Sequence, residues 1–143
     1  MELTDPLWDD LTDADWAAFA TAWNAELCGQ NAPKPLPKLP WLFDDPPGSA
    51  SEYVVPMNFT ASADAQWKFV VVAFKCGNEE THGHLAAGPV EHLLGNHGSE
   101  YITVVEQLAG ADPLFAKMLR GCNQNQMLDE VWRRLCLARG EVG

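Results

Sequence analysis

Histidine and cysteine are the residues of this 143-residue sequence that could hold a metal or act as acids and bases. The candidates are Cys76, His82, His84, His92 and His97. Structural zinc sites place ligands in close pairs such as Cys-x-x-Cys, whereas the four cysteines here are 48, 46 and 14 residues apart. On a helix, His92 and His97 would point about 140° apart. We therefore expect no metal and no cofactor, and a small enzyme or metal site built from these residues stays an alternative.

The segment from Asp9 to Asp13 has the Asp-Asp-x-x-Asp pattern by which prenyl-diphosphate synthases hold magnesium. No basic residue precedes Lys34 to bind a diphosphate, and Leu11 stands where a calcium loop needs an oxygen ligand. Carboxylates before and within the first turn of a helix interact favourably with the helix dipole, and we interpret these aspartates in that way. The sequence also lacks Gly-x-Ser-x-Gly, a phosphate-binding glycine loop and His-Glu-x-x-His. We expect no catalytic residues and predict that the protein is not an enzyme.

The charge of the chain is strongly negative and uneven. Nine Lys and Arg residues against 20 Asp and Glu residues leave a net charge of −11. Residues 1–33 hold seven carboxylates and residues 76–116 hold six, and neither segment has a basic residue. Such a field repels nucleic acid and anionic lipid and attracts basic proteins. The alternative is the ordinary solubility of an acidic domain.

Six tryptophans are many for this length. Four of them lie on predicted helical stripes and are expected in the core, namely Trp16, Trp23, Trp67 and Trp132. Trp8 and Trp41 lie outside such stripes and near Asp-Asp pairs, as aromatic anchors of an interface do. The predicted partner-binding residues are Trp8, Asp9, Asp10, Asp13, Trp41, Phe43, Asp44, Asp45, Glu79 and Glu80.

The patterning predicts an all-α fold, a bundle of about six short helices wrapped by a Pro-rich extended segment. Thr12 and Asp15 form a capping box for a helix over residues 12–28. Seven of the ten prolines fall within residues 30–57, which favours extended chain packed on the core. Further helices are expected between Ser62 and Gly77, over 78–87, 88–98 and 99–110, from Asp112 to Gly121, and after Asn123.

Two local alternatives and the domain organisation follow from the same patterns. The Val70-Val71-Val72 run allows a strand in place of the helix before Gly77. Gly88 and Pro89 are expected to separate two helices, with Glu91 capping the second. The length predicts a single domain over residues 1–143. The longest apolar run has six residues and the first residues are acidic, so we expect neither a membrane span nor a targeting signal, and a cytoplasmic location.

The stretch from His84 to Gly98 contains Leu-Ala-Ala-Gly-Pro-Val-Glu-His-Leu-Leu-Gly-Asn-His-Gly and precedes an Asp-Pro-Leu-Phe turn at residues 112–115. It resembles a family of small uncharacterised bacterial helical domains with the signature Leu-Ala-Ala-Gly-Pro-Leu-Glu-x-Leu-Leu-x-x-His-Gly. The resemblance covers residues 60–120, with Trp67 on the preceding helix. Residues 30–57 look like an insertion, and residues 121–143 follow the family's ending less closely. The resemblance implies an all-helical fold and no particular activity.

We expect a protein-binding inhibitor of the immunity or antitoxin type, because the chain is small, acidic and without catalytic motifs. The expected partner is a basic protein, such as a toxin with a nuclease-like active site, since an active site that holds phosphates must be basic. No direct binding of nucleic acid or membrane is expected. A helical adaptor with no inhibitory role is the second alternative to the enzyme or metal site.

Overall fold

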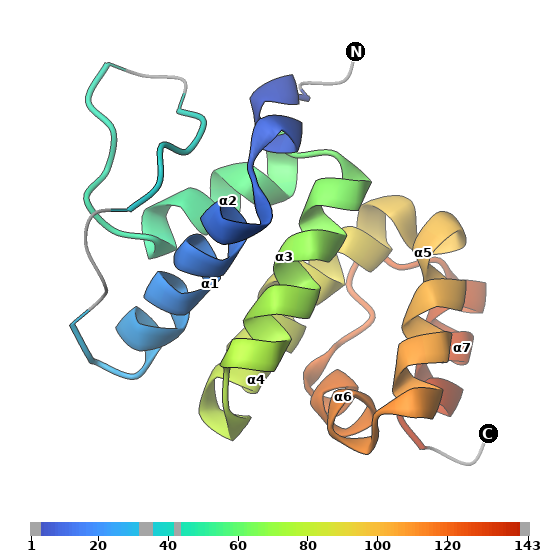
Figure 1. Cartoon of the computed structure of the whole chain (residues 1–143). Helices are drawn as coiled ribbons and strands as arrows, with labels where there is room; N and C mark the ends of the chain where they lie inside the picture. Colours follow the sequence, from blue (N-terminus) through green and yellow to red (C-terminus); the bar gives the residue numbers. More distant parts are fainter. Residues whose placement is uncertain (1–3, 32–35, 42–43, 141–143) are drawn as a thin grey trace. The chain divides into compact units, whose positions relative to one another are not determined.

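The computed structural model describes residues 4–31, 36–41 and 44–140, and these residues hold helices and no strand. Figure 1 shows their course. The elements are η1 (Pro6–Asp10), α1 (Asp13–Leu27), α2 (Ser51–Thr60), α3 (Ala63–Cys76), α4 (Glu79–Leu85), η2 (Ala86–Val90), α5 (Glu91–Ala111), α6 (Pro113–Met118), η3 (Leu119–Gly121) and α7 (Asp129–Ala138). The predicted all-α class is confirmed. The strand alternative at Val70–Val72 is wrong, because these residues lie within α3.

The chain divides into two compact units, Met1–Thr81 and His82–Gly143. Helix α4 begins in the first unit and ends in the second. The single domain expected from the length stays a prediction. No helix within the described ranges is long and apolar enough to cross a membrane.

The first unit is built on the packing of α1 against α3. Helix α1 begins with the predicted capping box, in which the Thr12 hydroxyl accepts from the Asp15 amide at 3.1 Å and Asp15 accepts from the Thr12 amide at 2.9 Å. Its inner face presents Phe19, whose ring centroid lies 4.8 Å from that of Phe69 on α3. Trp16 and Phe19 are at most 1% exposed, so an aromatic cluster forms the core of this unit.

Helix α2 is a correction to the expected extended chain over residues 30–57. Its start is capped from α1, since the Glu26 carboxylate accepts hydrogen bonds from the backbone amides of Ala50 at 2.7 Å and Ser51 at 3.0 Å. Pro56 lies inside the helix, where it removes one backbone hydrogen bond. Before α2, residues 36–41 have no regular structure, and Leu39 is 5% exposed. Leu39 is therefore covered by neighbouring residues, and the packing of the whole segment on the core stays a prediction.

The second unit corrects two predicted helix boundaries and confirms a third. The chain continues from α4 into α5 through the π-helical turn η2, so Gly88 does not end one helix and start another. The space around the Gly88 α-carbon is open. The predicted break near Gly98 is present, because α5 consists of two helical segments that meet at a non-helical kink at His97, where φ is −133° and ψ is 28°. Helix α7 begins at Asp129 rather than soon after Asn123.

Glu91 does not act as the expected cap. It is 5% exposed, and its carboxylate accepts a hydrogen bond from the Asn125 side chain in the loop before α7. Asn125 has a φ of 46°, a left-handed conformation that asparagine tolerates better than most residues. The buried carboxylate therefore fastens this loop to the start of α5.

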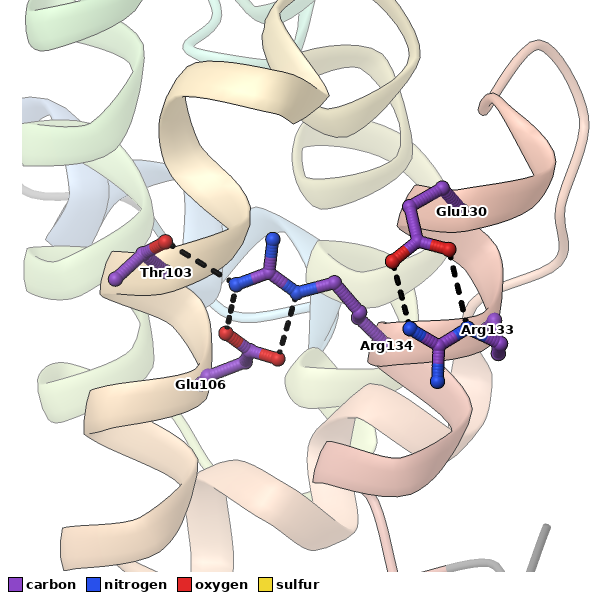
Figure 2. Close-up of polar contacts among 5 residues, drawn as sticks. All are labelled: Thr103, Glu106, Glu130, Arg133 and Arg134. Atoms are coloured by element: carbon purple, nitrogen blue, oxygen red, sulfur yellow. Dashed lines mark hydrogen bonds and ion pairs between the residues drawn. The ribbon is translucent and has the colours of Figure 1, made fainter.

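Helices α5 and α7 are also joined by an ion pair, shown in Figure 2. The Arg134 guanidinium donates to both Glu106 carboxylate oxygens, one of them at 2.9 Å, and to the Thr103 hydroxyl at 3.2 Å. These hydrogen bonds lower the pKa of Glu106 below its ordinary value. Glu130 and Arg133 form a second pair within α7, at 2.6 Å.

Two of the four tryptophans expected in the core are only partly covered. Trp16 and Trp23 are buried as predicted, whereas Trp67 and Trp132 are half-buried. The Arg139 guanidinium lies 4.7 Å from the centre of the Trp132 ring, a cation–π contact on the rim of the second unit.

Candidate functional site

The turn η1 separates the tryptophan of the N-terminal segment from its aspartates. Asp5 caps the turn by accepting from the Leu7 amide at 2.9 Å, and the Asp5 amide donates to the Thr60 carbonyl at 2.7 Å. This anchoring leaves Asp9 and Asp10 exposed. The same turn directs Trp8 into the core.

The predicted role of Trp8 as a surface anchor is wrong. Its side chain is 0% exposed, and its indole Nε1 donates to the Thr60 hydroxyl at 2.8 Å. Its ring lies 6.0 Å from that of Trp16 and 6.1 Å from that of Phe19. A tryptophan in this position stabilises the first unit and is not available to a partner.

Trp41 is half-buried and lines a surface hollow of about 460 Å³. Its ring lies edge-on against that of Tyr53, with 5.4 Å between the ring centroids and 69° between the planes. Asp44 and the exposed Leu7 line the same hollow. Trp41 therefore forms part of the wall of a hollow that can receive a side chain. It does not protrude as an anchor that inserts into a partner. The neighbouring Phe43 lies outside the described residues.

A second hollow of about 290 Å³ adjoins the first. The two share Leu7, Lys38, Leu39 and Pro40 as lining residues. The second hollow adds the carboxylates Asp10 and Asp15 and the side chain of Leu11. We call the two hollows together the acidic groove. It brings together three of the predicted partner-binding residues, Asp10, Trp41 and Asp44.

The other predicted carboxylates are exposed and are not among the residues that line this groove. Asp9 is exposed and accepts a hydrogen bond from Ser62 at 2.7 Å, and Asp13 and Asp45 are exposed. Glu79 and Glu80 lie at the opposite end of α1, because Asn78 contacts Cys28 there at 3.7 Å. A 15-residue helix is about 22 Å long, so these glutamates do not join Asp10 in one site.

Sequence reasoning missed the apolar half of the groove. Leu7, Leu39 and Tyr53 line it, and nothing in the helical patterns points to them. Their signal is the alternation of large apolar residues with prolines over residues 36–47, which indicates packed chain and does not say which side chains stay accessible. Asp15 was explained by its capping role, and it has that role in addition to lining the groove.

The side chains of the metal-site alternative are not gathered by the fold. Among the described residues no group of three or more His, Cys, Asp and Glu side chains could hold a metal ion. The Cys76 thiol instead accepts from the Asn24 side chain at 3.0 Å. Cys122 is 3% exposed, and burial together with the nearby Glu91 carboxylate raises the pKa of its thiol to about 12. Cys122 is therefore a neutral packing residue and no nucleophile at neutral pH.

A family model matches residues 45–142, more than half of the chain. The chain belongs to DUF6869, a family of unknown function. The DUF6869 match is longer than the expected 60–120, since it begins within the Pro-rich segment and includes the tail after residue 120. Helix α1 and turn η1 precede it, so the acidic groove combines Tyr53 and Pro46 from the DUF6869 region with Leu7 and Asp10 from before it. No curated protein and no solved structure matches the chain significantly.

Proposed function

We propose that this protein is an inhibitor of the immunity or antitoxin type, which binds and neutralises a basic toxin through the acidic groove of its first unit. The charge distribution supports this. The unit Met1–Thr81 contains 13 carboxylates and four lysines, a net charge of −9 out of −11 for the chain. A field of this strength on one unit accelerates encounter with a basic partner.

The acidic groove is the observation that carries the proposal. An interface needs an apolar centre and a polar rim, and here apolar walls formed by Leu7, Trp41 and Tyr53 lie beside the carboxylates of Asp10 and Asp44. A nuclease fits as the partner, because its active site must be basic to hold phosphates. A protein that presents carboxylates competes with nucleic acid for such a cleft.

Co-expression with the product of the neighbouring gene tests the proposal. If that product is toxic, this protein should restore growth and form a complex whose association slows steeply between low and physiological salt. Asp10, Asp44 and Asp45 changed together to Asn should slow association, whereas Trp41→Ala should mainly speed dissociation.

The matched control removes three exposed carboxylates from the second unit, by Glu100→Gln, Asp129→Asn and Glu130→Gln. Both triple variants change the net charge equally. An equal slowing of association by the two variants would therefore show that overall charge, and not the acidic groove, attracts the partner. A harmless neighbour would refute the inhibitor function. A complex without toxicity would favour the adaptor, and turnover of a small molecule would favour the enzyme.

A further inference from the structure

We infer that the acidic groove binds an extended segment of a protein partner in which a large apolar residue and an arginine or lysine lie two positions apart. This inference rests on the proposed function for the identity of the partner and on the geometry of the groove for the chemistry of the ligand. It assigns the apolar side chain to the larger hollow and the cation to the smaller one.

The larger hollow suits an apolar side chain. Most of its lining is apolar, namely Leu7, Leu36, Leu39, Trp41, Tyr53 and the prolines Pro37, Pro40, Pro46 and Pro47, and Lys38 and Asp44 complete it. A volume of about 460 Å³ lies within the range of pockets that enclose a compact apolar group. Leu7 is 57% exposed although it lines both hollows, so a ligand there would cover apolar surface that water now contacts.

The smaller hollow suits a cation. Asp10 and Asp15 line it, and Asp15 uses one carboxylate oxygen to accept from the Thr12 amide, which leaves its second oxygen as an acceptor. Proline has no backbone N–H, so the four proline positions of the groove offer no backbone donors. A groove lined by carboxylates attracts a ligand that carries donors and positive charge.

The adjacency of the two hollows fits two side chains on the same side of one ligand segment. They adjoin through the shared residues Leu39 and Pro40. In an extended chain, residues i and i+2 point to the same side, about 6.6 Å apart along the chain. Neighbouring hollows are therefore filled by residues i and i+2 of one segment. Lys38 also lines both hollows and opposes the cation, so it tunes the affinity downward.

The test uses a dye-labelled, end-capped heptapeptide, Gly-Ser-Leu-Ser-Arg-Ser-Gly, titrated with the full chain and followed by fluorescence anisotropy. We expect saturable binding that weakens at least about fivefold when the peptide's Leu becomes Ser or its Arg becomes Gln. In the protein, Leu7→Gln and Asp10→Asn should each weaken binding at least about threefold, whereas Lys38→Gln should tighten it. These three side chains are exposed, so the variants should keep the wild-type Tm.

Two control variants test whether the effects are specific to the groove. Leu114→Gln changes a leucine of the second unit that is 63% exposed, similar to Leu7. Asp13→Asn removes a carboxylate that is not among the lining residues of either hollow. Neither should alter binding. Binding that ignores Leu7→Gln and the peptide's Leu, or no binding at millimolar peptide, would overturn the inference. Self-association that Leu7→Gln abolishes would show a second copy to be the occupant and would also overturn it.

The outcomes separate this inference from the proposed function. Peptide binding without growth rescue would leave the groove standing and remove the inhibitor. Growth rescue that survives both Leu7→Gln and Asp10→Asn would keep the inhibitor and place the toxin on another surface.

Discussion

Single residues in this protein show how close packing decides whether a side chain is tolerated. An ideal β-carbon at Gly98 on α5 would lie 2.9 Å from both γ-carbons of Val131 on α7, closer than real contacts allow. We predict that Gly98→Ala lowers the free energy of unfolding by about 1–3 kcal/mol, because the clash outweighs the gain in helix propensity. Thermal and urea denaturation would measure this change.

The control for this prediction is Gly110→Ala near the end of the same helix, where the space around the α-carbon is open. It should leave stability unchanged or raise it slightly. Val131→Ala removes the clashing atoms, so its cost should be smaller in the Gly98→Ala background than in the wild type. Additive costs of the two changes would contradict the close contact.

The start of helix α2 is stabilised by a residue that is distant in sequence. The Glu26 carboxylate accepts from the backbone amides of Ala50 and Ser51 and from the Ser51 hydroxyl. We predict that Glu26→Ala destabilises the protein by about 1 kcal/mol, the cost of losing a helix N-cap. Glu52→Ala is the control, because this exposed side chain accepts from the Ser49 hydroxyl, whereas the backbone amides of Ala50 and Ser51 donate to Glu26. Equal losses from the two variants would contradict the capping role of Glu26.

Sequence alone predicted the elements whose signals are local. Helix α1 carries its own capping box at Thr12, and α3 has its cap at Ser62, whose hydroxyl accepts from the Ala65 amide at 3.1 Å. Helix α2 could not be foreseen, because its cap comes from Glu26 and the prolines before it indicate extended chain. The carboxylates of the groove were predictable from the charge pattern, whereas its apolar walls depend on which side chains the Pro-rich segment leaves accessible.

At the scale of the whole molecule, uneven charge is the dominant electrostatic property. The first unit carries −9 and the second −2. In the second unit, pairs such as Glu106 with Arg134 and Glu130 with Arg133 bring opposite charges together. Exposed pairs of this kind contribute little to stability, so the repulsion among the carboxylates of the first unit should outweigh them.

We therefore predict that the Tm rises by a few degrees as NaCl increases from about 0.01 M to 0.15 M, since the Debye length falls from about 30 Å to about 8 Å and screens the repulsion. Changing Asp9, Asp10, Asp44 and Asp45 together to Asn should raise the Tm at low salt and flatten this dependence. The triple variant of the second unit, with Glu100, Asp129 and Glu130 neutralised, should keep more of the salt dependence than the quadruple variant. A Tm that falls with added salt would mean that attractive ion pairs dominate. The carboxylates of the first unit would then not measurably lower the stability of the fold.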